Sequence, residues 1–270
     1  MTMKKIKMIG SIVMFSLILM ACGKTSTSAT EDTEETFLGE PGDTFVIGLD
    51  DTFVPMGFRD NEGNLVGLDV DLATEAAERL DLEIEFQPID WAMKETELNS
   101  GKIDAIWNGY SMTDERKEKV AFSTPYHQSG QVFVVLEDSP IETWADLSGV
   151  VVAAQQSSST VDLLMNHESG ILDTFANGEV IQYPSYNDVF NDLESGRSEA
   201  IAVSETYARY YMKQKGEGQY RILDESFGQE DTAVGVRKSD TEFLDKLNAV
   251  LAEMEEDGTL QDIKSKWIVE

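Results

Sequence analysis

The sequence predicts an α/β protein whose folded body has two lobes, each built on a sheet with helices packed against it. Three observations support this prediction: strand and helix patterns alternate along the chain, a short helix–turn–strand motif occurs twice, and the body extends over residues 43–270. A body of this length is too long for one typical hydrophobic core and suits two. Alternating strands and helices favour layered α/β folds with mainly parallel sheets.

The first 21 residues have the pattern of a secretory signal peptide. A positive start is followed by the apolar stretch 8–20, which is shorter than a membrane span, and the positive charges come from Lys4, Lys5 and Lys7. The stretch ends in Leu19-Met20-Ala21-Cys22, which resembles the processing site of a bacterial lipoprotein. We therefore expect cleavage before Cys22 and lipidation of its thiol. An ordinary signal peptide followed by an incidental cysteine is the alternative.

Residues 22–42 are rich in Ser, Thr and Glu and contain few apolar side chains. Such a segment buries too little apolar surface to offset the entropy of ordering, so we expect a flexible tether. A lipid on Cys22 would hold the body at a membrane surface. The expected location is the outer face of the cell membrane, or the periplasmic side in a host with two membranes.

The composition excludes several classes of function. The net charge is -30, and removal of the three lysines in the signal peptide makes it -33, which disfavours nucleic acid as a partner. Cys22 is the only cysteine, so we expect no disulfides and no thiolate metal site. Only His127 and His167 are available for a histidine metal site or a catalytic triad. We therefore expect no metal, no cofactor and no catalytic residues.

The periodicity of apolar residues predicts the main elements in order. Residues 44–50 form an apolar strand, residues 67–80 an amphipathic helix, and residues 82–87 a strand in which apolar and polar residues alternate. Near the C-terminus, apolar residues recur with helical spacing over residues 243–254, and Gly258 is expected to end that helix.

The repeated motif places two loops in comparable positions. Residues 97–106 (ELNSGKIDAI) and 192–201 (DLESGRSEAI) share a helix end, a Ser-Gly turn and a buried strand. The motif therefore predicts the same unit in both lobes, with equivalent loops at residues 107–110 and 202–205. Ligands of open α/β sheets lie at the carboxyl ends of strands, so these loops are expected to face a shared cleft.

The stretch Ile106–Tyr126 (IWNGYSMTDERKEKVAFSTPY) contains the most informative set of polar groups. The polar loop Asn108–Ser111 follows an apolar strand, and a helix begins at Thr113 and contains Arg116. A guanidinium binds a carboxylate with two parallel hydrogen bonds, and backbone N–H groups complete such a site. The stretch therefore predicts binding of the carboxylate of a small ligand.

Three stretches carry a resemblance to family 3 of the bacterial extracellular solute-binding proteins, the receptors of polar amino-acid ABC importers. They are residues 46–73, 97–126 and 251–267. The resemblance extends over almost the whole body and implies a type II periplasmic-binding fold. Lobe 1 would comprise residues 43–131 and 226–270, lobe 2 residues 132–225, and two crossing strands would join them. It also implies closure on an amino acid, delivery to a membrane permease, and a monomer.

The same resemblance implies roles for individual residues of the first lobe. Arg116 matches the family position that holds the ligand α-carboxylate, although a surface cation paired with a neighbouring acid is the alternative. Ser111 matches the hydroxyl beside it, and Asn108 and Gly109 match positions that contribute mainly backbone groups. Trp107 and Tyr110 are expected to be packing residues, with a place in the pocket lining as the alternative for either.

Further positions extend the expected ligand site. Phe53 and Trp91 match aromatic positions that sandwich the ligand, and Asp50 matches a position near the ligand's polar end, although it could equally be solvated at a strand end. In the second lobe, Ser158 and Ser159 match positions that bind the carboxylate at a helix N-terminus. Capping of that helix by serine is an alternative compatible with this role.

The chain departs from the family pattern at one important position. Relatives usually carry an aspartate for the ligand α-ammonium where this chain has Ser204, followed by Glu205. A buried ammonium without an anionic partner is costly. Either Glu205, Asp50 or Asp231 supplies the charge, or the ligand is not an ordinary α-amino acid. Glu205 could also be a first-turn helix acid with no ligand role.

Two other functions are compatible with the same scaffold. Some dehydratases that act on prephenate-like acids resemble this family, and they need an acid or base in the cleft. A ligand-sensing receptor read by a partner protein is the second alternative. The expected lipid anchor and the shortage of histidine favour an importer receptor without enzymatic activity.

Overall fold

The computed structural model of this protein describes residues 39–216 and 218–269. The predicted signal peptide, Cys22 and most of the predicted tether lie outside the described residues. Within the described part, no helix is both long and apolar enough to cross a membrane.

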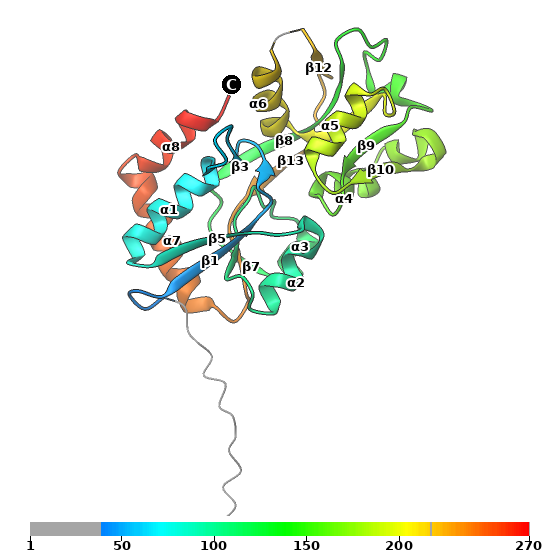
Figure 1. The fold of residues 1–270 in the computed structure, drawn as a ribbon. Helices are drawn as coiled ribbons and strands as arrows, with labels where there is room; N and C mark the ends of the chain where they lie inside the picture. Colours follow the sequence, from blue (N-terminus) through cyan, green and yellow to red (C-terminus); the bar gives the residue numbers. More distant parts are fainter. Residues whose placement is uncertain (1–38, 217, 270) are drawn as a thin grey trace, which may run out of the picture. The chain divides into compact units, whose positions relative to one another are not determined.

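The first sheet has five strands in the order β5-β1-β6-β14-β7 (Figure 1). Its strands are β1 (Thr44–Leu49), β5 (Glu83–Pro88), β6 (Ala105–Ile106), β7 (Ala121–Phe122) and β14 (Gly235–Val236). β1 pairs in parallel with β5 and β6, whereas β14 is antiparallel to β6 and β7. The strands predicted at 44–50 and 82–87 are confirmed as β1 and β5.

Helices cover both faces of this sheet (Figure 1). One group packs together and shares a hydrophobic core with β1; it consists of α1 (Leu68–Leu80), α7 (Thr241–Glu256) and α8 (Thr259–Trp267). The other face carries α2 (Lys94–Asn99) and α3 (Asp114–Lys119). The predicted helices are confirmed, and Gly258 adopts a left-handed conformation between α7 and α8.

The second sheet has the order β10-β9-β11-β8-β12, with β13 paired to β8. Its strands are β8 (His127–Leu136), β9 (Val152–Gln155), β10 (Val180–Tyr183), β11 (Ala200–Ser204), β12 (Tyr220–Ile222) and β13 (Gly228–Thr232). The helices around it are α4 (Ser159–Asn166), α5 (Tyr186–Glu194) and α6 (Glu205–Lys215).

Alternation along the central strands gives the second sheet two separate cores. On β8, Phe133 and Val135 belong to the core that includes α4 residues, whereas Val132 and Val134 belong to the core that includes α5 and α6 residues. This alternation follows from the two-residue period of a strand, because successive side chains point to opposite faces. The central strands β8, β9 and β11 are therefore buried on both faces.

Two features differ from expectation. The repeated motif does form a helix, a turn and a strand twice, but residues 202–205 are not a loop. β11 continues through Ser204 and α6 begins at Glu205, because β11 pairs with β8 beyond the point where its pairing with β9 ends. A small sheet of β2 (Thr52–Phe53), β3 (Gly57–Arg59) and β4 (Leu65–Val66) was not predicted.

The chain crosses from the first sheet to the second at β8 and returns to the first sheet after β13. These strands pair in antiparallel fashion, with His127 opposite Thr232 and Gln131 opposite Gly228. Thr232 also forms a bridge with Ser111, in the loop that follows β6. The strand pair therefore brings residues of both sheets close to the loop that carries the predicted carboxylate site.

Candidate functional site

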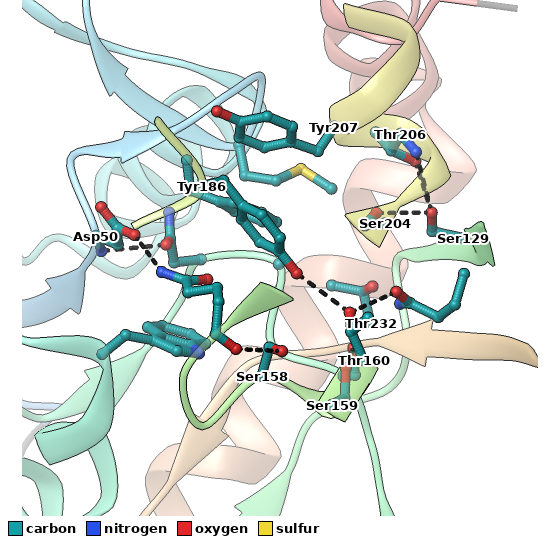
Figure 2. Close-up of a pocket in the computed structure, with 18 of the residues that line it drawn as sticks. Asp50, Ser129, Ser158, Ser159, Thr160, Tyr186, Ser204, Thr206, Tyr207 and Thr232 are labelled. Atoms are coloured by element: carbon teal, nitrogen blue, oxygen red, sulfur yellow. Dashed lines mark hydrogen bonds between the residues drawn. The ribbon is translucent and has the colours of Figure 1, made fainter. Parts of the chain in front are cut away.

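A cavity is lined by residues that belong to both sheets and their loops (Figure 2). It contains about 550 Å³ of space between atoms, including the part open to solvent. The lining includes ten of the eleven predicted ligand contacts: Asp50, Phe53, Trp91, Asn108, Gly109, Ser111, Arg116, Ser158, Ser159 and Ser204.

Arg116 is the cation of this lining. It is 4 % exposed, and its guanidinium lies 4.6 Å from the ring centre of Tyr110. Thr113 caps α3 by accepting a hydrogen bond from the Arg116 backbone N–H, which fixes the position of the residue. Within residues 39–216 and 218–269, no carboxylate lies within 4.0 Å of the guanidinium, so Arg116 is not the surface ion pair considered as the alternative.

Two carbonyl oxygens hold the guanidinium in place. Arg116 Nη1 donates to Ser111 O at 3.2 Å, and Nη2 donates to Ser157 O at 3.3 Å. A guanidinium has five N–H groups in a rigid fork, so these two bonds leave donors for an anion. The arrangement combines a buried positive charge with unused donors at a cavity wall, which is the chemistry expected of a carboxylate site.

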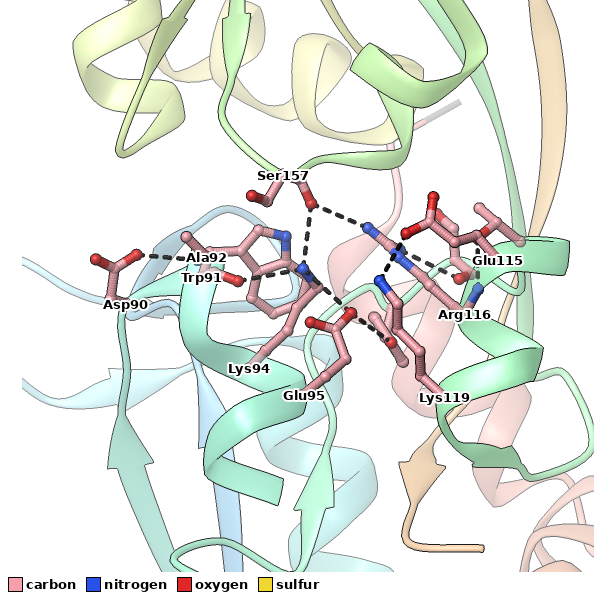
Figure 3. A network of polar contacts seen from close by, with 12 residues as sticks. Asp90, Trp91, Ala92, Lys94, Glu95, Glu115, Arg116, Lys119 and Ser157 are labelled. Atoms are coloured by element: carbon pink, nitrogen blue, oxygen red, sulfur yellow. Dashed lines mark hydrogen bonds and ion pairs between the residues drawn. The ribbon is translucent and has the colours of Figure 1, made fainter. Parts of the chain in front are cut away.

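Ser157 also accepts a bond from a second cation, Lys94 (Figure 3). Lys94 Nζ donates to Ser157 O and to Trp91 O, in both cases at 3.2 Å. Burial lowers the pKa of Lys94 to about 8, and the positive charge of Arg116 acts in the same direction. Ser157 itself has a φ of +54°, in the left-handed region. One carbonyl from the loop before α4 thus faces two cations from the first-sheet side.

The N-terminus of α4 has the geometry of a capped helix. Ser158 Oγ accepts from Val161 N at 3.4 Å and donates to Gln155 O at 2.7 Å. The capping alternative is therefore observed, while Ser158 and Ser159 also line the cavity. Both residues are buried.

Asp50 is the carboxylate among the described residues of the lining. Its Oδ1 accepts from Thr52 N at 2.9 Å and from Thr52 Oγ1 at 2.6 Å, and its Oδ2 accepts from Gln155 Nε2 at 2.8 Å. Burial raises the pKa of Asp50 despite these hydrogen bonds. The Asn108 side chain accepts from Asp50 N at 3.1 Å, so this amide supports the strand end.

Aromatic rings form another part of the wall. Phe53 stacks on Tyr186 and Tyr207, with ring centres 5.6 Å and 5.4 Å apart. Trp91 meets Tyr110 edge-on at 6.0 Å. Trp107 and Tyr110 are fully buried and do not line the cavity, as expected of packing residues.

Position 109 requires glycine because of its backbone conformation and because there is no room for a side chain. Its φ is +58°, and a Cβ built on it would lie 2.5 Å from Phe53 Cε1. Its N–H donates to Asp69 Oδ2 at 2.6 Å. Asp69 is fully buried, and this burial raises its pKa to about 7.

The end of β11 contributes hydroxyl groups to the cavity. We call Ser129, Ser204 and Thr206 the hydroxyl cluster: the Oγ atoms of Ser129 and Ser204 are 2.9 Å apart, and Thr206 Oγ1 donates to Ser129 Oγ at 3.0 Å. His127 Nε2 lies 2.9 Å from Thr206 Oγ1, and burial lowers the pKa of His127 to about 4. The cluster and its histidine are therefore neutral near pH 7.

Glu205 is not part of the cavity lining. Its Oε1 accepts from Arg209 Nε at 2.8 Å, one turn along α6. Glu205 therefore has the position of an acid in the first turn of a helix, which was the alternative without a ligand role.

Half of the lining was not predicted from sequence: Val54, Met56, Ser129, Gln131, Gln155, Thr160, Tyr186, Thr206, Tyr207 and Thr232. Two of these positions carried a usable signal. Gln131 begins an otherwise apolar strand segment, and Gln155 ends one, three residues before the predicted Ser158. Tyr186 and Tyr207 lie in helices of ordinary amphipathic pattern, so only the tertiary fold brings them to the cavity.

Known proteins resemble this chain over most of its length. Residues 45–270 match the bacterial extracellular solute-binding proteins, family 3. The chain is 32% identical over 226 residues to the L-cystine-binding protein TcyJ of Escherichia coli K12, covering 83% of this chain and 82% of that protein. It is 27% identical over 266 residues to the arginine-binding extracellular protein ArtP of Bacillus subtilis, covering 98% of each.

Solved structures support the same assignment. A substrate-binding protein of an ABC uptake transporter from Streptococcus pneumoniae, with bound histidine, is 40% identical with a TM-score of 0.81, covering 83% of this chain and 92% of that chain. An ancestral arginine-binding protein bound to arginine is 36% identical with a TM-score of 0.77, covering 84% and 99%. The predicted α/β fold of the type II periplasmic-binding class is thereby confirmed. The chain belongs to the bacterial extracellular solute-binding proteins of family 3.

Proposed function

We propose that this protein is the receptor of an ABC importer and captures a small polar amino acid in the cavity between its two sheets. One observation carries the proposal: Arg116 is buried at the cavity wall with unused donors and, in the described part of the chain, no carboxylate within 4.0 Å. A buried charge without a partner is costly, so the site is suited to an anionic group of a ligand.

The lining suggests how an amino acid would lie. The α-carboxylate would bind Arg116, with Ser111 and the backbone at Asn108 and Gly109 beside it, and with Ser158 and Ser159 at the N-terminus of α4. Charge-assisted hydrogen bonds of this kind contribute about 1.5–3 kcal/mol each. Phe53 and Trp91 would flank the side chain, and Asp50 would accept from its distal polar group.

Closure would proceed as a movement of two lobes, residues 43–131 with 226–270 and residues 132–225, about two hinge segments near residues 131–135 and 223–227. Bonds that cross between these lobes support this proposal. Gln155 donates to Asp50 at 2.8 Å, and Arg116 and Lys94 both donate to Ser157 O. A ligand that contacts both lobes stabilises the closed state, because these contacts exist together only there. Micromolar affinity corresponds to a binding free energy of about 8 kcal/mol, which a few charge-assisted hydrogen bonds and the burial of the ligand can supply.

The N-terminal sequence supports a proposal for where the protein acts. We propose that the mature protein is a monomer, anchored by a lipid on Cys22 to the outer face of a membrane, and that a permease receives the ligand. Cys22→Ser should release the protein into the soluble fraction of cells without changing amino-acid affinity. A Cys22→Ser protein that still fractionates with membranes would contradict the anchor.

A thermal-shift screen tests the proposed ligand class. The panel would contain the proteinogenic L-amino acids and L-cystine, since relatives are named for binding cystine, arginine and histidine. A ligand that binds the folded state raises the melting temperature by mass action, and binding at a hundredfold excess over Kd corresponds to about 2.7 kcal/mol. At least one polar amino acid should stabilise the protein. Absence of stabilisation by every member would contradict the proposal.

The relatives named above are described as amino-acid-binding proteins, which supports a binding function over an enzymatic one. A related solved structure, 30% identical, is an ancestral amino-acid-binding protein described as a precursor of cyclohexadienyl dehydratase, and thus a binding protein. Steady product formation from prephenate-like acids would be needed to reopen that alternative.

A further inference from the structure

A pair of aromatic rings outside the cavity joins the two proposed lobes. Phe58 on β3 contacts Tyr210 on α6, with ring centres 5.7 Å apart. Phe58 belongs to the proposed lobe of residues 43–131 with 226–270, whereas Tyr210 belongs to that of residues 132–225. Both side chains are half-buried, and neither lines the cavity. We call this contact the outer aromatic pair.

The elements that carry this pair also carry a second aromatic pair, at the cavity wall. Phe53 on β2 stacks on Tyr207 on α6 with ring centres 5.4 Å apart, and both residues line the cavity. Figure 2 shows Tyr207 beside Tyr186 at this wall. We call the contact of Phe53 with Tyr207 the inner aromatic pair. The β2–β3 hairpin of one lobe thus meets α6 of the other lobe at two places.

Local geometry explains why one pair faces the cavity and the other does not. In the β2–β3 ladder, Phe53 lies opposite Gly57, the residue before Phe58. Successive residues of a strand point to opposite faces, so Phe53 and Phe58 lie on different faces of the hairpin. On α6, Tyr207 and Tyr210 are three residues apart, a spacing that makes them neighbours on the helix surface. Each tyrosine therefore meets one of the two phenylalanines.

Phe58 is held in position by its own lobe. Trp267 on α8 meets the Phe58 ring edge-on, with ring centres 5.8 Å apart and an angle of 89° between the planes. Trp267 Nε1 in turn donates to Asp71 Oδ2, on α1, at 2.7 Å. A ring that is already packed loses little rotamer freedom when a second ring contacts it. The contact with Tyr210 therefore costs little entropy on the Phe58 side.

Opening of the cavity separates the two aromatic pairs together. In the proposed closure, the lobes part to admit a ligand, and α6 then moves away from the β2–β3 hairpin. Because both pairs lie on these two elements, the outer pair breaks when the inner pair breaks. We infer that the outer aromatic pair is a clasp that stabilises the closed state and thereby raises ligand affinity without touching the ligand. This inference rests on the proposed amino-acid function.

A clasp of this kind has an effect that does not depend on which ligand is bound. Contacts that exist only in the closed state shift the equilibrium between the open and closed forms, and the apparent affinity follows that equilibrium. The outer pair contributes the same factor for every amino acid, because no ligand touches it. The inner pair faces the bound side chain, so its contribution varies with the ligand.

The test measures Kd by calorimetry and the dissociation rate by stopped flow for each amino acid of the thermal-shift panel that wild type binds. Tyr210→Ala should raise Kd about twofold to tenfold, the range expected for loss of an aromatic pair, mainly through faster dissociation. The factor should be the same for every amino acid bound. Phe53→Leu is the comparison, and its factors should differ between amino acids. Tyr210→Phe keeps the ring and should restore wild-type affinity.

Phe58→Leu removes the same contact from the other lobe and provides the test if Tyr210→Ala does not fold. Because one contact is lost in either variant, the double variant should lose clearly less affinity than the product of the two single losses. Unchanged Kd in folded Tyr210→Ala and Phe58→Leu, with lower stability to urea alone, would overturn the inference by showing a purely structural role. Fully multiplicative losses would overturn it too. A wild-type protein that binds no amino acid of the panel would instead contradict the proposed function itself.

Discussion

The side chain of Gln155 reaches from the end of β9 to the carboxylate of Asp50 at the end of β1, with 2.8 Å between Nε2 and Oδ2. Its second N–H donates to Pro184 O at 3.0 Å, so both hydrogens of the amide are used. Asp50 and Gln155 are both buried. This bond joins the two proposed lobes at the cavity wall, and it can exist only when they are together.

Gln155→Ala should therefore weaken ligand binding, mainly by faster dissociation. A hydrogen bond to a charged group contributes about 1.5–3 kcal/mol, so we expect a loss of about tenfold or more in Kd. Stopped-flow dissociation and calorimetry would measure it. Gln156→Ala is the control, because Gln156 is more exposed and contacts Asp90 at a long 3.5 Å. Unchanged dissociation in Gln155→Ala would show that this bond does not hold the closed state.

Gly109→Ala should disturb the cavity through Phe53. A left-handed conformation alone costs a non-glycine residue about 1–2 kcal/mol. At Gly109 the new Cβ would also lie 2.5 Å from the Phe53 ring, whereas at Gly101, with φ +74°, nothing lies within 4 Å. Gly101→Ala thus isolates the backbone cost. Both variants should be less stable to urea, but only Gly109→Ala should lose ligand affinity; equal affinities would show that Phe53 does not shape the site.

Trp91 should report ligand binding by fluorescence. It lines the cavity at 7 % exposure, so a bound ligand would change the surroundings of its ring. The emission of wild type should shift with saturation at the calorimetric Kd, and Trp91→Phe should lose that response. Trp144→Phe is the control, because Trp144 packs on Phe133 away from the lining and should keep the response. A full response in Trp91→Phe would remove Trp91 from the site.

Asp69 should make stability fall as pH rises. The pKa of Asp69 is raised from 3.8 to about 7 by burial, so between these values the folded protein keeps a proton that the unfolded chain has lost. The folded state then binds more protons, and its stability from this group decreases with pH until about pH 7, by at most about 1.4 kcal/mol per pH unit.

Urea denaturation of wild type and Asp69→Asn at about pH 5 and about pH 8 measures this contribution as a difference between proteins. Asparagine can still accept from Gly109 N, so the variant keeps that bond. Wild type should lose more stability over the interval than Asp69→Asn. Parallel changes in the two proteins would show that Asp69 is ionised throughout.

Much of the fold and half of the cavity lining could be predicted because their signals are local. Asn108, Ser111 and Arg116 lie within a few residues of one strand end, and Thr113 caps the helix that carries Arg116. A strand, a polar loop and a capped helix in succession place such groups together whatever surrounds them. Their roles as ligand contacts remain predictions.

The remaining lining residues depend on long-range packing. Tyr186 and Tyr207 reach the cavity because α5 and α6 cover one face of the second sheet, and Glu230 reaches Ser159 because β13 pairs with β8. Glu205 was predicted to contact the ligand but lies outside the cavity lining. Its neighbour Ser204 lines the cavity, yet a favourable partner one helical turn away, Arg209, holds the Glu205 carboxylate along α6. Sequence spacing alone could not decide between these positions.

The most direct test of the account is the amino-acid affinity of Arg116→Ala, measured by calorimetry with the amino acid that best stabilises wild type. Circular dichroism should show an intact fold, and affinity should fall about tenfold or more, because a charge-assisted contact to the carboxylate is lost. The control is Arg59→Ala, which removes an exposed arginine paired with Asp51 and should leave Kd unchanged. A folded Arg116→Ala protein that binds the amino acid with wild-type affinity would contradict the account.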